Sequence, residues 1–187
     1  EDVSPSAAVW VNPAVEYRWP SYRIRIHGFE KQIELSYASI SSQYFADIVT
    51  SKINLIGNAA HESTAAPGVL LLDTEVCDVS LTEITTACGT SYRGSVVIDC
   101  RGPKPAGESL FSQTGYQKFW GFELELHSDW PFEEPIVMDD SIDQSDGFRF
   151  LYSLPFERRR VLVEDTRFSN STIIDRDECL EQVGSYL

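Results

Sequence analysis

Two adjacent acids at the end of an apolar segment are the residues of this sequence best suited to chemistry. The residues Arg160–Val163 are predicted to form a strand, and this strand leads directly into Glu164 and Asp165. Partial burial at such a place raises the pKa of a carboxyl, which can then stay protonated near neutral pH and act as an acid. Because side chains alternate along a strand, the two acids point to opposite faces, and at most one of them faces a given pocket.

A structural interpretation of the same two acids remains open at this point. Acids often mark the position where a strand leaves the core, and here Arg149 or Arg167 could neutralise one of them. Perturbed carboxyls occur in structural ion pairs as well as in active sites. The acids therefore predict either an acid catalyst or a charged strand end.

Aromatic side chains are concentrated in the same half of the chain. They are Tyr116, Phe119, Trp120, Phe122, Trp130, Phe132, Phe148, Phe150, Tyr152, Phe156 and Phe168. Aromatic faces can line an apolar ligand tunnel, and their quadrupole stabilises a nearby cation. Such residues more commonly fill a core, so they indicate a ligand site only in combination with the two acids.

Other kinds of site find no support in the sequence. It contains no G-x-S-x-G elbow, no P-loop and no G-x-G-x-x-G dinucleotide fingerprint. The cysteines are far apart, which argues against a metal site and favours buried free thiols in a reducing cytoplasm. They are Cys77, Cys88, Cys100 and Cys179. The formal charge of −14 argues against binding to nucleic acid and to anionic lipid through a broad basic face.

The elements that must position these residues form an α+β pattern, a mostly antiparallel sheet with covering helices. Helices are expected from Ser41 to about Gly57 and from Asp175 onward, the second with Cys179, Val183 and Tyr186 on its inner face. Strands are expected at 22–26, 32–35, 69–72, 75–79, 82–86, 95–98, 118–127, 135–138, 148–154 and 160–168. The last two should pair as antiparallel neighbours, since a short connection containing Pro155 joins them.

Several blocks of the sequence together resemble the bacterial type of lycopene β-cyclase. In chain order they are YRWPSYRIRI, YASISSQYFADIV, VVIDCRG, TGYQKFWGFELE, PIVMDDSID and GFRFLYSLPFERRRVLVEDTRF. Plant lycopene cyclases have a related series, G-Y-Q, F-M-D and L-E-E-T. The similarity extends from about Arg18 to Leu187, and it is least characteristic in residues 54–94.

The resemblance implies a fold, a reaction and a cofactor. In this family a flavin-binding domain of the glutathione-reductase type is split around a substrate domain built on an antiparallel sheet. The enzymes convert lycopene to γ- and β-carotene without net redox change, yet they need reduced FAD and hence NAD(P)H. Glu164 matches the family's essential acid and has Asp165 beside it, whereas Asp99 and Gly102 match the turn that approaches the flavin.

The resemblance also suggests residues that contact the substrate. Phe150, Tyr152 and Phe168 occupy neighbouring strand positions around the acids, and Tyr116 and Met138 lie in the matching blocks. These five are the candidates for binding a linear carotenoid. An enzyme with this substrate would be cytoplasmic and would contact the membrane peripherally, without a metal.

The sequence departs from the family because the Gly-rich nucleotide motif and the Gly-rich closing segment are missing. Residues 1–187 are therefore expected to be a single fragment, the substrate domain, with 95–102 as a possible return strand to the flavin domain. We expect this fragment alone to bind no flavin and to be inactive. Two alternatives remain: the substrate domain of another flavoprotein, such as a monooxygenase or prenyl reductase, and a non-catalytic module that binds an apolar ligand or a protein.

Overall fold

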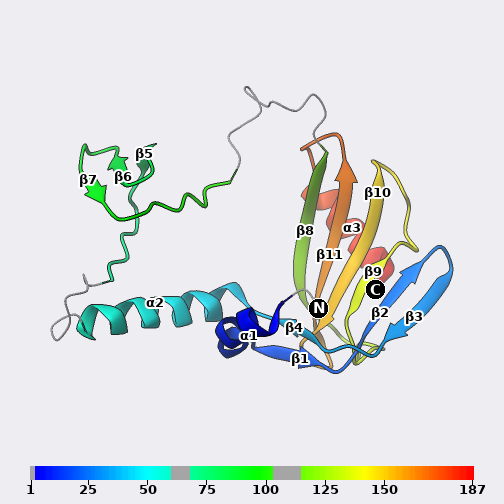
Figure 1. Ribbon diagram of the computed structural model, residues 1–187. Coiled ribbons are helices and arrows are strands. Elements are labelled where there is room, and N and C mark those ends of the chain that lie inside the picture. The colour runs from blue at the N-terminus through cyan, green and yellow to red at the C-terminus, as the bar shows by residue number, and fades with distance from the viewer. Residues whose placement is uncertain (1–2, 60–67, 103–114) are drawn as a thin grey trace. The chain divides into compact units, whose positions relative to one another are not determined.

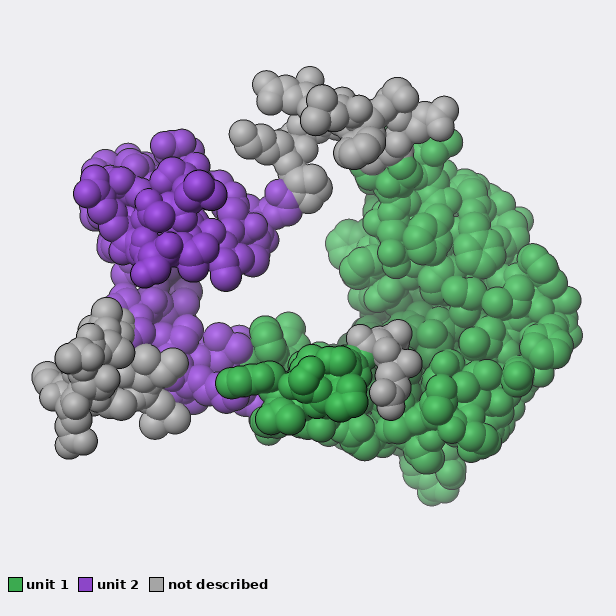
Figure 2. Space-filling view, in the orientation of Figure 1, with its two compact units in different colours: residues 1–45, 113–187 green, residues 46–112 purple. Residues whose placement is uncertain are grey.

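A computed structural model describes residues 3–59, 68–102 and 115–187. The chain divides into two compact units, one formed by residues 1–45 with 113–187 and the other by residues 46–112 (Figure 2). The structure is mixed α+β and consists mostly of sheet with few helices. The predicted fold class is confirmed at this level.

The first unit is built on a six-stranded sheet in which every neighbouring pair is antiparallel except β2 and β9, which are parallel (Figure 1). Its strands, in spatial order, are β3 (Phe29–Ile33), β2 (Tyr22–Ile26), β9 (Ile136–Asp139), β10 (Phe148–Pro155), β11 (Arg160–Ser169) and β8 (Tyr116–Glu125). The predicted pairing of β10 with β11 is confirmed, with Phe148 opposite Phe168 and Pro155 opposite Val161.

Helix α3 (Arg176–Tyr186) packs on one face of this sheet (Figure 1). The Asp175 carboxylate caps it by accepting hydrogen bonds from the backbone N–H groups of Asp177 and Glu178. The helix buries Cys179 and Val183 fully, and Tyr186 packs at the edge of the same core, as predicted. The sheet contributes the other core residues, Phe122, Leu151, Val161 and Val163.

A two-stranded ribbon, β1 (Tyr17–Trp19) and β4 (Tyr37–Ser39), adjoins one end of the sheet. The Trp19 indole N–H donates to the backbone carbonyl of Pro155 at 3.3 Å. The ring of Tyr17 lies 4.4 Å, centroid to centroid, from that of Phe156. Both contacts join the ribbon to the β10–β11 connection. Helix α1 (Pro5–Val11) and a 3-10 turn (Asn12–Ala14) precede the ribbon.

Helix α2 (Ser42–Ala59) connects the two units in sequence, as the pattern from Ser41 predicts. The second unit also holds a three-stranded antiparallel sheet of β5 (Val76–Val79), β6 (Glu83–Thr86) and β7 (Ser91–Arg93). Most of the loop expected at 57–68, and that expected from Gly102 to Gly107, fall outside the described residues.

Two strand predictions in the second unit are wrong, those at 69–72 and 95–98. Leu72 and Ile98 are 72% and 80% exposed. An apolar run becomes a strand only where a partner accepts its backbone hydrogen bonds, and neither run pairs with another described strand. The prediction of buried thiols holds for Cys179 alone, because the other three lie in or beside this small, open unit and are exposed.

Candidate functional site

Strand alternation gives the large sheet two chemically different faces. One face packs on α3. The other, called the Glu164 face below, is formed by Phe148, Phe150, Tyr152 and Leu154 of β10, Leu162, Glu164, Thr166 and Phe168 of β11, and Phe119 and Gly121 of β8. The centre of this face is apolar and aromatic apart from Glu164, Thr166 and the Tyr152 hydroxyl, whereas the more exposed ion pair of Glu123 and Arg160 lies farther along the same face. The face brings together the largest share of the predicted site residues.

Glu164 lies in the interior of this face and is partly buried. Its direct cross-strand neighbours are Tyr152 on β10 and Gly121 on β8. The Thr166 hydroxyl, two residues further along β11, donates a hydrogen bond to Glu164 Oε1 at 2.7 Å. The carboxyl is therefore held on a paired strand between an aromatic ring and a residue without a side chain.

Three phenylalanines form a cluster beyond Thr166. Ring centroids lie 5.7 Å apart for Phe148 and Phe150, 6.2 Å for Phe150 and Phe168, and 6.5 Å for Phe148 and Phe168. Phe150 is buried, whereas Phe148 and Phe168 present their rings to the outside. Such a surface suits an extended apolar ligand and can stabilise positive charge that develops on it.

On the other side of Glu164 the ribbon contributes a tyrosine. The hydroxyl groups of Tyr37 and Tyr152 are hydrogen-bonded at 2.7 Å. Burial raises the pKa of Tyr152 far above its usual value, and the Tyr37 hydroxyl and the nearby Glu164 carboxylate raise this pKa further. Tyr152 is thus a neutral phenol over the physiological pH range, suited to packing and hydrogen bonding rather than to proton transfer.

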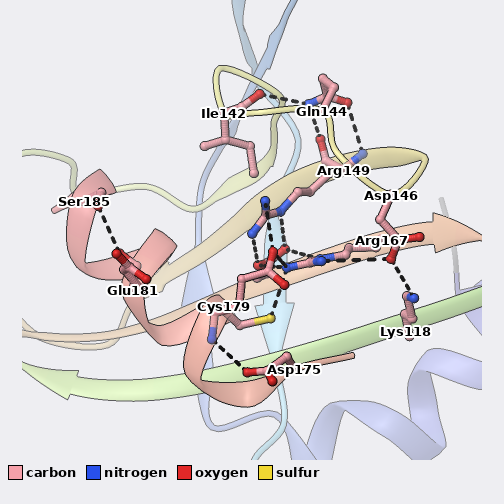
Figure 3. Close-up of polar contacts among 12 residues, drawn as sticks. Lys118, Ile142, Gln144, Asp146, Arg149, Arg167, Asp175, Cys179, Glu181 and Ser185 are labelled. Atoms are coloured by element: carbon pink, nitrogen blue, oxygen red, sulfur yellow. Dashed lines mark hydrogen bonds and ion pairs between the residues drawn. The ribbon is translucent and has the colours of Figure 1, made fainter. Parts of the chain in front are cut away.

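Asp165 lies on the α3 face, in a buried ion-pair network with Arg149 and Arg167. Figure 3 shows these two arginines close together beside α3. Arg149 donates to both of its oxygens, at 2.9 and 2.5 Å, and Arg167 Nη2 donates at 3.2 Å. Arg167 also binds the Glu178 carboxylate of α3 at 3.0 Å. Burial alone would raise the pKa of Asp165, but the hydrogen bonds from Arg149 and Arg167 outweigh it and hold this pKa below its usual value.

The two acids therefore have different surroundings, as strand alternation predicts. Asp165 is ionised, and guanidinium groups occupy both of its oxygens, so it has no proton to offer. The structure does not bring it to the site with Glu164, and the expectation of a catalytic Asp165 gives way to a structural role. The proposed neutralisation by Arg149 or Arg167 applies to Asp165, since both arginines bind it.

Strand alternation also places Met138 and Tyr116, the two candidates from the blocks that match the family. Met138 pairs with Ile24 and alternates with Asp139, which binds Tyr186 of α3, so Met138 lies toward the Glu164 face. Tyr116 shares its parity on β8 with Phe122 of the α3 core. At the end of β8, however, Tyr116 lines the same surface pocket as Phe168, and its contact with the substrate stays a prediction.

Comparison with known proteins identifies the family of this chain. Residues 3–187 match the family model described as lycopene cyclase protein. The chain belongs to the lycopene cyclase family. It is 32% identical to the lycopene beta-cyclase of Pantoea ananas over 97% of this chain, and 30% identical to that of Pseudescherichia vulneris over 100%. A Paracoccus lycopene beta-cyclase is 31% identical over 94%. The chain spans 43%, 44% and 41% of these relatives, respectively, and no solved structure matches it.

The residues matched to the flavin turn of lycopene cyclases lie in the second unit. Gly102 has φ +84, and a Cβ there would meet nothing within 4 Å, which suits a turn that a ligand approaches closely. Asp99 is already engaged, because the Arg101 guanidinium binds both of its carboxylate oxygens at 2.8 Å. The proximity of Asp99 and Gly102 to a flavin stays a prediction.

Sequence reasoning missed three residues that surround the acid in this member of the lycopene cyclase family. Thr166 could have been found because it lies two residues after Glu164 on β11, and side chains two apart on a strand share a face. Gly121 could have been found because it is a glycine inside the strand predicted at 118–127. Tyr37 gave no such signal, because 115 residues separate it from Tyr152. Within the described ranges no group of three His, Cys, Asp or Glu side chains could hold a metal ion. Among the described helices, none has the length and apolarity that crossing a membrane requires.

Proposed function

We propose that this chain forms the substrate-binding part of a flavin-dependent lycopene cyclase, with Glu164 as the acid that starts ring closure. The observation that carries the proposal is the single carboxyl in the interior of an aromatic sheet face, between Tyr152 and Gly121. Membership of the lycopene cyclase family and the names of the relatives support the choice of a linear carotenoid as substrate.

The reaction needs one proton, which Glu164 donates to the substrate and takes back after ring closure. Glu164 gives its proton to the less substituted carbon of the terminal double bond, whose π electrons form the new C–H bond, and the O–H pair stays on the carboxylate. The neighbouring double bond closes the ring on the resulting tertiary cation. A ring proton then returns to Glu164, and its C–H pair becomes the ring double bond. Lycopene thus isomerises to γ-carotene, and then to β-carotene, without an oxidant or reductant.

The aromatic face suits this reaction for two reasons. Rings such as Phe150 and Tyr152 present π faces that favour the passing cation over a neutral chain. An apolar surrounding also keeps away water, which would quench the cation. Phe168 and Met138 would contact the polyene farther from the acid.

The finer assignments extend this proposal. We infer that the six-stranded sheet corresponds to the substrate domain of a glutathione-reductase-type flavoprotein. Reduced FAD, kept reduced by NAD(P)H, would be held largely by segments beyond the stretch that matches the relatives, with Gly102 near it. Bound there, the reduced flavin would supply negative charge close to the cation. Peripheral contact with a membrane would give access to so apolar a substrate.

The direct test replaces the acid without changing its size. Glu164→Gln in the full-length protein, expressed in a lycopene-accumulating bacterium, should lower cyclised product roughly 100-fold or more, because an amide cannot protonate an alkene. Glu123→Gln is the matched control: it makes the same change on the next inter-strand pair of the same face, but Glu123 is 52% exposed and already paired with Arg160 at 2.5 Å. Normal β-carotene from Glu164→Gln at equal protein level would overturn the proposal.

A further inference from the structure

The hydrogen bonding of Glu164 makes its two oxygens unequal. Oε1 accepts the hydrogen bond from the Thr166 hydroxyl at 2.7 Å. Thr166 is 1% exposed, on a strand paired on both sides, so this donor is fixed in place. No described side chain donates to Oε2. The carboxyl thus has one bound oxygen and one free oxygen.

Gly121 leaves space directly beside the free oxygen. A Cβ at position 121 would lie 3.8 Å from Glu164 Oε2 and 3.5 Å from Leu162 Cδ1. Both are ordinary van der Waals distances, so a methyl group would fit the fold but would occupy the surface next to Oε2. The residue across the other edge of β11 is Tyr152, which has a side chain where Gly121 has none.

A neutral carboxyl has one carbonyl oxygen, which accepts hydrogen bonds, and one hydroxyl oxygen, which carries the proton. A hydroxyl that donates to Oε1 makes Oε1 the carbonyl oxygen and leaves the proton on Oε2. We propose that Thr166 is a positioning residue that places the acidic proton of Glu164 on Oε2, and that Gly121 keeps open the space where the substrate double bond meets it. The inference rests on the proposed function and concerns the same site.

Thr166 is tested by removing its hydroxyl at nearly constant volume. In the full-length protein, supplied with lycopene in phosphatidylcholine vesicles, FAD and NADPH, Thr166→Val should lower kcat about tenfold and leave KM within about twofold, since the donor orients the acid without binding the substrate. Thr166→Ser restores the hydroxyl and should restore most of kcat. If Thr166→Ser is as slow as Thr166→Val, or if Thr166→Val turns over normally, the positioning role is wrong.

Gly121 is tested by adding one methyl group. Gly121→Ala should raise KM about tenfold or more, because it fills the space that the substrate end would occupy. Gly115→Ala is the matched control, since a Cβ there would meet nothing within 4 Å, and it should leave KM unchanged. A normal KM in Gly121→Ala would refute the proposed space.

Glu164→Gln distinguishes a failure of the proposed function from a failure of the roles proposed for Thr166 and Gly121. If that variant is inactive while Thr166→Val and Gly121→Ala behave like the wild type, the orientation of the proton by Thr166 and the substrate space at Gly121 are both refuted, and the proposed function stands. If Glu164→Gln is itself fully active, the proposed function fails, and the inference fails with it.

Discussion

The buried network around Asp165 allows a quantitative prediction about stability. The side chains of Asp165, Arg149 and Arg167 are 0%, 1% and 3% exposed. Asp165 binds both arginines, and the half-exposed Glu178 pairs with them at 4.0 and 3.0 Å. Asp165→Asn keeps the size of the side chain but leaves two buried guanidinium groups without their full counter-charge. Breaking a buried pair in this way costs about 3–5 kcal/mol, so the free energy of unfolding should fall by that amount.

An exposed ion pair provides the control. Asp129 pairs with Arg159 at 2.9 Å, but their side chains are 46% and 58% exposed. Asp129→Asn should therefore leave the free energy of unfolding nearly unchanged, because water already solvates both charges. Urea-induced unfolding of the full-length protein, followed by tryptophan fluorescence, measures both variants. A loss below about 1 kcal/mol for Asp165→Asn would refute the view that this network holds β10, β11 and α3 together.

The same network has a pH signature whose sign follows from the depressed pKa of Asp165. A carboxyl with a lower pKa in the folded state contributes stability above its unfolded pKa of about 3.9 and loses it as the pH falls through the folded value. The wild type should therefore lose stability below about pH 4 more steeply than Asp165→Asn. If the stability of the wild type and of Asp165→Asn falls equally as the pH is lowered, the depressed pKa of Asp165 is contradicted.

Two further predictions concern the elements that support the site. Gly147 has φ +92, and a Cβ there would lie 2.2 Å from the Phe168 carbonyl oxygen, so Gly147→Ala should destabilise by roughly 2–3 kcal/mol in the urea assay. Gly184→Ala, inside α3 with nothing within 4 Å, should instead stabilise by up to about 1 kcal/mol, and a similar loss at both glycines would refute the steric argument. Asp175→Ala removes the cap of α3 and should cost about 1 kcal/mol in thermal unfolding; an unchanged midpoint would show that the cap contributes nothing.

The sequence could predict the elements whose signals are local. The β10–β11 hairpin combines two alternating runs with a short connection, and α3 combines a capping residue with a helical apolar spacing. The runs at 69–72 and 95–98 have equal apolar character, yet they are not strands. A strand depends on a partner elsewhere in the chain, and the runs themselves carry no information about one.

The candidate site likewise contains residues that local sequence patterns could place and residues that only the fold brings together. Glu164, Phe150 and Phe168 could be placed together because they lie on one hairpin and share a parity. Tyr37 reaches the site from a separate ribbon, and only the fold brings it to Tyr152. Tyr116 has the parity of the α3 core although its block matches the family, and only the end of β8 brings it to the same pocket as Phe168.

The adjacency of Glu164 and Asp165 suits the acid role proposed for Glu164. A carboxyl that protonates a double bond must be held to within a fraction of an ångström, and its own strand must therefore be rigid. On β11 the next residue provides this rigidity, because Asp165 ties the strand to β10 through Arg149 and to α3 through Arg167 and Glu178. One strand thus carries a fixed charge on its buried face and the proposed proton donor on its apolar face. Loss of Asp165 should therefore reduce both stability and activity, whereas loss of Glu164 should reduce activity alone.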